Sequence, residues 1–309
     1  MNPLRRSCSS ALQSRIPTLF TPSQLPCTTT TTTTFLRAFS QSASHNRGGL
    51  PVFLPPSTPE LAEHLSTLNR RVLLPCHLTQ EQQELVYKPA NRARIETEPI
   101  EITLGDVTLP LEHLDRLQDI PRRRTVIHEI LKTSQTRDDW ENVMRMMEGC
   151  RNAGIELKPE WKERIVRKLG EGGLQHLILK ALQRVEATGL NLSDWTVVVE
   201  VVRAVRDKAA MADWEKDELV KALKMAEQVV ELMEEDGHLG KVSGPQDWRG
   251  HPAVVALPLE LAAELVYRYE VEGGEEKVKK YAARLMNALK QKNYLDDNVE
   301  VCLLPPLFN

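Results

Sequence analysis

The feature that most constrains the fold of this sequence is an internal repeat. Residues 139–157 align with residues 174–192, and both segments end in the pattern Gly-(Ile/Leu)-x-Leu, at Gly154 and Gly189, which lie 35 residues apart. A glycine just past the last turn of a helix can adopt the left-handed conformation that ends the helix, and the aliphatic residue after it folds back over that turn. The repeat therefore predicts two helices that end in the same way.

Each of these two helices follows another amphipathic segment. Residues 125–133 and 160–169 carry apolar side chains at helical spacing, so each repeat is predicted to be a helical hairpin that buries its apolar face against the next hairpin. Two less regular hairpins follow, at residues 192–235 and 259–290. Aromatic residues make up only 5% of the chain, and the second half is rich in residues that favour helix over strand.

One segment before the repeat has β character. Ile100 and Val107 lie on either side of Gly105-Asp106, in the alternating pattern of a short hairpin. The expected fold class is therefore mostly α: a right-handed α-solenoid of helical hairpins, with a short N-terminal β-hairpin and a disordered N-terminal presequence.

The first 39 residues differ from the rest of the chain in charge. They contain four arginines, many serines and threonines and no acidic residue, and the first carboxylate is Glu60. Mitochondrial import peptides have this composition, and the sequence Arg-Ala-Phe-Ser at residues 37–40 resembles a cleavage site of the mitochondrial processing peptidase. We predict cleavage near Phe39 or Ser40. The alternatives are a disordered low-complexity tail, which the threonine run at residues 28–34 also fits, and a secretory signal, whose compact apolar stretch is missing.

Composition and punctuation by glycine and proline divide the chain into segments. The predicted segments are a mitochondrial presequence (1–39), a disordered linker (40–57), an N-terminal cap region with short helices and a β-hairpin (58–119), a helical-repeat region (120–236), a loop (237–257), a C-terminal helical hairpin (258–292) and a tail (293–309).

The repeat resembles the pentatricopeptide repeat family, whose unit is a helical hairpin that ends in a glycine-aliphatic pair. Residues 160–194 match that unit best, with Gly173 at the turn between the helices and Gly189 near the end; residues 125–159 have Asp138 where the turn glycine would stand. The last hairpin resembles a tetratricopeptide unit equally well. The resemblance implies a mitochondrial protein that works in organelle RNA metabolism.

The resemblance also implies positions that contact RNA bases, near the start of the first helix and at the end of each repeat. In this chain Glu129 and Pro159 occupy them in the first unit, and Arg164 and Asp194 in the second; only Asp194 has the expected small polar character. Basic clusters near these positions indicate either contact surfaces or solvated faces balanced by glutamates. The candidate partner or RNA contacts are Arg122, Arg123, Arg124, Lys158, Lys162, Arg164, Arg167, Lys168 and Asp194.

The charge balance argues against a general electrostatic attraction to RNA. The chain has 40 basic and 43 acidic residues, a net charge of −3, and removal of the presequence with its four arginines makes it more acidic. RNA binding by such a chain would depend on a local basic surface.

No catalytic, cofactor-binding or metal-binding motif is present in the sequence. The five cysteines lack the short spacing of metal or redox sites, and nucleotide-binding loops and nucleophile motifs are missing. We therefore expect no enzyme, no cofactor and no metal. No apolar run approaches the ~20 residues that span a bilayer, so we do not expect an integral membrane protein.

The import-peptide composition together with the resemblance to pentatricopeptide repeats implies a non-catalytic helical-repeat adaptor in mitochondrial gene expression. It would act in the matrix, bound to the mitochondrial ribosome or assisting the processing or translation of messenger RNA. The alternative is an assembly factor or chaperone that holds a protein segment of a respiratory-chain complex, with a peripheral place on the inner membrane as a further option. The sequence leaves open whether the ligand is RNA or protein.

Overall fold

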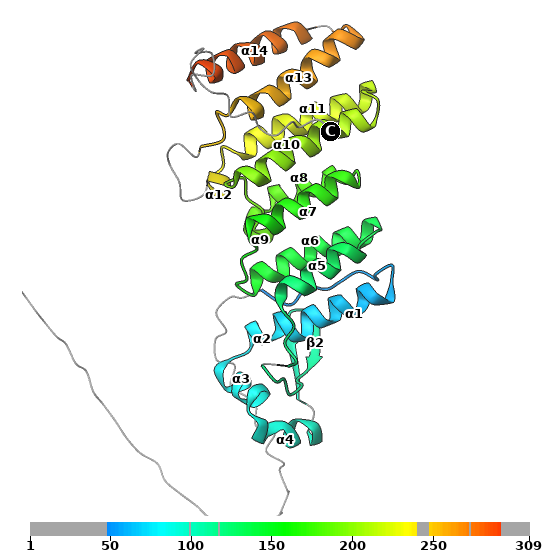
Figure 1. Cartoon of the computed structure of the whole chain (residues 1–309), viewed down its shortest axis with the longest axis vertical. Coiled ribbons are helices and arrows are strands. Elements are labelled where there is room, and N and C mark those ends of the chain that lie inside the picture. Colours follow the sequence, from blue (N-terminus) through cyan, green and yellow to red (C-terminus); the bar gives the residue numbers. More distant parts are fainter. Residues whose placement is uncertain (1–47, 99, 117, 240–246, 272, 292–309) are drawn as a thin grey trace, which may run out of the picture. The chain divides into compact units, whose positions relative to one another are not determined.

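The computed structural model describes residues 48–98, 100–116, 118–239, 247–271 and 273–291 of the 309-residue chain. Helices dominate these residues, and the strands within them form one two-stranded sheet (Figure 1). The prediction of a mostly α fold with a short β-hairpin is confirmed. The predicted presequence and the predicted tail lie outside the described residues.

The first helical segment begins with a side-chain cap. Thr58 Oγ1 accepts a hydrogen bond from the Leu61 N–H at 3.2 Å, and Pro59 occupies the first turn, where a backbone N–H has no partner within the helix. The segment runs on as α1 (Pro59–Thr67), a π-helical turn (Leu68–Leu73) and α2 (Leu74–His77).

Short helices precede the hairpin in the chain. α3 (Gln80–Tyr87) starts with a capping box, in which Thr79 and Gln82 bond each other's backbone N–H. α4 (Arg92–Thr97) follows and was not predicted. β1 (Glu101–Leu104) pairs antiparallel with β2 (Val107–Pro110). Gly105 in the connecting turn has φ +67°, a conformation that glycine adopts without strain.

Helices make up most of the described chain after the hairpin. They are α5 (Arg123–Thr133), α6 (Arg137–Asn152), α7 (Pro159–Glu171), α8 (Gln175–Gln183), α9 (Val185–Thr188), α10 (Trp195–Met211), α11 (Lys216–Leu232), α12 (Asp236–Leu239), α13 (Pro252–Tyr269) and α14 (Gly274–Gln291). Packing links successive pairs: α1 lies on α5, α7 on α10, α11 on α13 and α13 on α14. Their apolar faces form one continuous core.

Two helix ends confirm the mechanism inferred from the repeat. Gly154 and Gly189 have φ angles of +71° and +69°, and the aliphatic residues after them, Ile155 and Leu190, are buried. The Ile155 N–H donates to the carbonyl oxygen of Cys150 at 2.8 Å and so closes the last turn of α6. The glycine-aliphatic pattern of the repeat therefore marks true helix ends.

Residues 48–57, named here the strap, form the described part of the predicted disordered linker (40–57) and are not disordered, while residues 40–47 lie outside the described residues. The strap is extended and lies along α6. The Leu54 N–H donates to Asn142 Oδ1 at 2.7 Å, and the Leu54 carbonyl oxygen accepts from Asn142 Nδ2 at 3.0 Å. Proline leaves such a segment few donors of its own, and the polar side chains of α6 supply the partners that its backbone needs.

Asp139 on α6 binds the end of the strap through hydrogen bonds. Its carboxylate accepts hydrogen bonds from the Ser57 N–H at 3.0 Å and the Ser57 hydroxyl at 2.6 Å, and from the backbone N–H groups of Gln135 and Thr136. Burial by itself raises the pKa of Asp139, but these hydrogen bonds outweigh burial and lower the pKa to about 2. The strap is therefore joined to α6 by an ionised, fully buried carboxylate.

The loop predicted over residues 237–257 is shorter than expected. α12 occupies its start, and α13 begins at Pro252 rather than near Leu259. Pro258 explains the difference, because proline inside a helix removes a hydrogen bond and is typical of a helix boundary. Here Pro258 lies within α13 and is buried in the core.

Candidate partner-binding surfaces

The predicted basic residues fall on two neighbouring helices. Arg122, Arg123 and Arg124 are exposed at the N-terminus of α5, whose first turn contains no acidic residue. Cations at this end of a helix face the positive end of the helix dipole, which is unfavourable by roughly 0.3–1 kcal/mol each. Three arginines at the unfavourable end of one helix are not explained by the stability of that helix.

Trp161 on α7 brings the two basic clusters together. The guanidinium carbons of Arg124 and Arg164 lie 5.9 and 5.3 Å from the centre of its ring. Arg164 Nη1 also lies 3.1 Å from His128 Nδ1 on α5. Trp161 is only 9% exposed, so its ring has no open face on which a base could stack. The ring instead positions the two arginines.

The structure separates the other predicted contacts from this group. Lys162 is half-buried, and its Nζ donates to Asn191 Oδ1 at 3.1 Å; burial lowers its pKa, which the nearby Asp194 carboxylate partly opposes. Arg167 and Lys168 form ion pairs within α7, at 2.9 Å with Glu163 and 2.7 Å with Glu171. The charges of these three side chains are therefore already paired or hydrogen-bonded within the chain.

Five of the nine predicted residues are cations that form no ion pair with a described carboxylate, so their charge is available to a ligand. Among the residues that the structure describes, no carboxylate oxygen lies within 4.0 Å of any of them. We call them the α5/α7 cation group: Arg122, Arg123, Arg124, Lys158 and Arg164.

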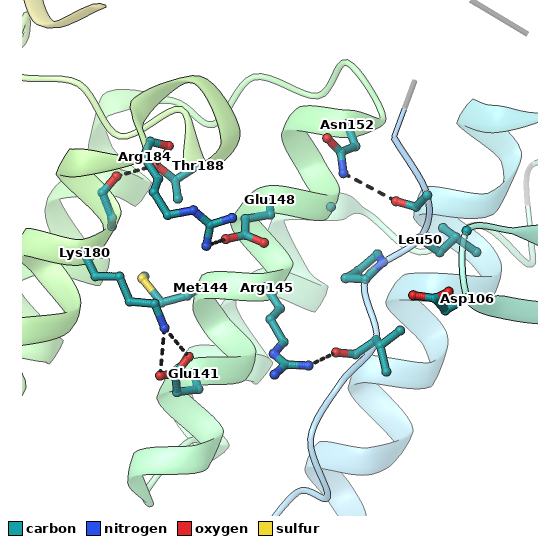
Figure 2. Close-up of a pocket in the computed structure, with 16 residues that line it drawn as sticks. Leu50, Asp106, Glu141, Met144, Arg145, Glu148, Asn152, Lys180, Arg184 and Thr188 are labelled. Atoms are coloured by element: carbon teal, nitrogen blue, oxygen red, sulfur yellow. Dashed lines mark hydrogen bonds and ion pairs between the residues drawn. The ribbon is translucent and has the colours of Figure 1, made fainter. Parts of the chain in front are cut away.

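A groove of about 430 Å³ lies between the strap, α6 and the α8–α9 segment (Figure 2). Lys180 Nζ lies 3.1 Å from both Glu141 carboxylate oxygens, and Arg184 Nη1 lies 2.7 Å from Glu148 Oε1. Arg145 donates to the carbonyl oxygen of Val52 in the strap. Each of these cations already has a partner, so the groove has little charge to offer a phosphate, and sequence reasoning did not single it out.

The described residues also show no arrangement suited to catalysis. Within them, no three His, Cys, Asp or Glu side chains are grouped closely enough to hold a metal ion. Cys150 is buried, which raises the pKa of its thiol to about 12 and leaves it protonated at neutral pH. None of the described helices is long and apolar enough to cross a membrane.

Comparison with known proteins decides the family. The profile of the mitochondrial ribosomal protein mS27 family matches residues 37–303. This chain belongs to the mS27 family. The small ribosomal subunit protein mS27 of Neurospora crassa is 28% identical to it over 225 residues, which cover 70% of this chain and 57% of that relative. The chain thus spans little more than half the length of that mS27 relative.

Membership of the mS27 family corrects the resemblance to pentatricopeptide repeats. A helical hairpin that ends in glycine and an aliphatic residue is a general solution for stacked helices, so its spacing does not identify one family. The mS27 family is a family of mitochondrial ribosomal proteins, which agrees with the predicted mitochondrial and non-enzymatic character of the chain. It does not favour the respiratory-complex assembly factor, and nothing supports a place on the inner membrane.

Proposed function

We propose that this chain is a structural, non-catalytic component of the small subunit of the mitochondrial ribosome and acts in the mitochondrial matrix. The support is its membership of the mS27 family and its similarity to a protein that carries the name of a small-subunit component. As part of the same proposal, its helical hairpins stack as a right-handed α-solenoid, for which the packing of successive pairs is the support.

Within that role, the α5/α7 cation group binds phosphate groups of ribosomal RNA. The observation that carries this step is that five cations lie on two adjacent helices without carboxylate partners in the described part of the chain. Arginine binds phosphate through parallel N–H donors, and phosphate contacts account for much of the affinity of proteins for RNA. A local group of this kind is effective even in a chain of negative net charge.

The contact is expected to follow the RNA backbone and not its base sequence. Arg164, at one of the positions implied for base contact, is turned toward Trp161 and His128. Glu129, at another, lies 3.8 Å from Lys132 on its own helix. Recognition by phosphate position and RNA shape needs no base-specific side chain.

Sedimentation of mitochondrial lysate in sucrose gradients tests the proposal. The protein should migrate with the small ribosomal subunit when magnesium is removed to separate the subunits, and should leave that fraction after RNase digestion. Migration as a free chain, or with an RNase-resistant particle that lacks ribosomal RNA, would contradict a ribosomal role.

A charge-reversal variant tests the binding surface separately. Arg124→Glu with Arg164→Glu should weaken association with the subunit about tenfold or more and reduce its dependence on salt by about one unit of slope for each phosphate that is no longer bound. Lys280→Glu with Lys290→Glu makes the same change in net charge at exposed positions on α14, and should leave both unchanged. Equal losses of affinity in the two variants would assign the effect to net charge alone.

A further inference from the structure

A second surface lies where the turn between α10 and α11 meets the end of α13. Three non-glycine residues of the described chain have left-handed backbone, and all three are here: Asp213 and Trp214, with φ +48° and +60°, and Glu270, with φ +46°. Tyr269 joins the two segments, because its hydroxyl donates to the carbonyl oxygen of Trp214 at 2.9 Å. Left-handed backbone is unfavourable for residues with a Cβ and persists only where surrounding contacts hold it.

The Trp214 ring is held between two arginines whose charge is already compensated. The guanidinium carbons of Arg206 on α10 and Arg268 on α13 each lie 5.8 Å from the centre of the ring. Arg206 Nε donates to Glu260 Oε1 at 2.8 Å, and Arg268 Nε to Glu264 Oε2 at 2.7 Å. These contacts fix the position of the ring and compensate both arginines, and the exposed Lys216, whose Nζ lies 5.8 Å from the centre of the Tyr269 ring, adds one positive charge beside it.

Large apolar side chains are exposed on both segments, and Tyr267, two residues from Tyr269 on α13, lies on another face of that helix. Tyr267 is 86% exposed and Met211 is 58% exposed, the two highest values among the large apolar side chains of the described residues. Met211 ends α10 just before the left-handed turn, and Tyr267 precedes Arg268 on α13. We call Met211, Trp214, Tyr267 and Tyr269 the Trp214 junction. Its two segments lie at the same side of the helices in Figure 1.

Aromatic residues and methionine are the types enriched at the centres of protein interfaces. Their exposure costs free energy in a free chain, because apolar surface remains in water. The hydrogen bond from Tyr269 also holds the two segments together before a partner binds. Less conformational entropy is therefore lost on association.

The charge around the Trp214 junction indicates the kind of partner. Asp213, Glu215, Asp217 and Glu270 are exposed, and in the described part of the chain no basic nitrogen lies within 4.0 Å of their carboxylate oxygens. These four junction carboxylates would repel the phosphates of RNA and attract lysine and arginine side chains.

We propose that the Trp214 junction is a docking surface for a basic segment of a neighbouring protein. The Tyr267 ring and the Met211 side chain provide the apolar contact, and the junction carboxylates pair with lysines or arginines at its edge. This goes beyond the proposed function, which assigns RNA contact to α5 and α7 and no protein contact to α10 and α13.

Oxidative footprinting with hydroxyl radicals, read by mass spectrometry, tests whether the surface is covered. Tyr267 and Met211 should be oxidised about tenfold more slowly in intact mitochondria than in the purified full chain, because an interface centre excludes water. The protection should survive RNase digestion of a mitochondrial extract. Oxidation at the rate of the purified chain, or protection that disappears with RNase, would overturn the proposal.

Zero-length carbodiimide cross-linking, which joins carboxylates to lysine amines, tests the nature of the partner. At least one junction carboxylate should be joined to lysines of another protein. In a Met211→Ser, Tyr267→Ser double variant this yield should fall about tenfold, as expected when interface anchors are removed, whereas Met286→Ser on α14 should leave it unchanged. An unchanged yield in the double variant, or no cross-link in the unaltered protein, would overturn the proposal.

The same preparations separate this proposal from the ribosomal one. A chain that is absent from the small-subunit fraction but whose Tyr267 is protected and cross-linked contradicts the ribosomal role and supports the docking surface. A chain that migrates with the small subunit while Tyr267 stays as reactive as in the purified protein does the reverse.

Discussion

Two tryptophans of this protein each lie close to two arginines, with opposite consequences for binding. At Trp161 the guanidinium carbons of Arg124 and Arg164 are 5.9 and 5.3 Å from the ring centre; at Trp214 both corresponding distances are 5.8 Å. The geometry around the two rings is similar. The difference is in the partners of the arginines.

The arginines near Trp214 are bonded to Glu260 and Glu264 of α13. Those near Trp161 have no carboxylate within 4.0 Å among the described residues. An arginine beside an aromatic ring therefore does not mark a phosphate site by itself, because the ring only positions the cation. The availability of the charge is the ground on which we propose an RNA-facing surface at Trp161 and a protein-facing one at Trp214.

The largest expected effect tests whether the two rings have the same structural role. Trp161 is 9% exposed and Trp214 is half-buried, so Trp161→Ala should lower the free energy of unfolding by about 3–5 kcal/mol and Trp214→Ala by less. Urea denaturation of both variants measures the difference. Equal effects would mean that the rings are equally important to the core, and the comparison would then rest on charge alone.

The next effect compares two carboxylates in different settings, Asp139 beneath the strap and Glu218 on α11. The pKa of Asp139 is about 2, below the value of about 3.9 in an unfolded chain. Its contribution to stability is therefore fully present above about pH 5 and is lost as the pH falls through 4 toward 2, by about 2–3 kcal/mol in total. Denaturation curves between pH 5 and pH 2 should show this decrease, and Asp139→Asn should flatten it.

Glu218 on α11 is the matched control for that pH dependence. Hydrogen bonds from Lys208 and Lys221 also lower the pKa of Glu218 to about 2, but its side chain is partly exposed and solvent screens the pairing. Glu218→Gln should change the pH profile less than Asp139→Asn does. A larger change in the Glu218 variant would show that the strap contributes little to stability.

A smaller effect is expected when the arginines near Trp214 lose their carboxylate partners and come to resemble those near Trp161. Glu260→Gln with Glu264→Gln removes the carboxylates that pair with Arg206 and Arg268. The variant should bind a single-stranded RNA oligomer a few-fold more tightly, with a salt dependence steeper by about one unit for each additional phosphate bound. Fluorescence anisotropy at several salt concentrations measures both.

The control for this conversion is Glu275→Gln with Glu276→Gln, which changes the net charge equally in the first turn of α14. If it increases RNA binding as much, charge pairing at the Trp214 junction does not explain the difference between the two surfaces.

The smallest effect concerns the left-handed turn itself. Asp213 has φ +48° and is exposed, so Asp213→Gly relieves unfavourable backbone and should raise the free energy of unfolding by roughly 0.5 kcal/mol. Asp217→Gly in the first turn of α11 should lower it by about 0.5–1 kcal/mol. Thermal denaturation of the pair checks the sign, and a destabilised Asp213→Gly would show that the aspartate side chain itself holds the turn.

Features that depend on neighbouring residues could be predicted from the sequence. Gly154 and Gly189 end their helices in the left-handed conformation as predicted, the turn at Gly105 joins the two strands, and the cap of α3 is formed by Thr79 and Gln82, three positions apart. Caps, tight turns and helix periodicity are formed by residues a few positions apart, so their physical causes are visible in a short stretch of chain.

What only the tertiary structure decided involves partners far apart in the chain. The sequence of the strap is typical of a linker, because its partners, Asn142 and Asp139, lie 88 and 82 positions away from the strap residues that they bind. Likewise, the sequence presented the eight basic residues among the predicted contacts without showing which of them are paired, and only the folded chain divides them into paired and available charges.

The same reason explains why the Trp214 junction was not predicted. The hydrogen bond from Tyr269 to Trp214 and the pairing of Arg206 with Glu260 link residues 55 and 54 positions apart. Local composition determined that the protein is helical and where its hairpins end. Which charges are neutralised, and which apolar side chains remain in water, depended on segments brought together by packing, because ion pairing and burial act through space and not along the chain.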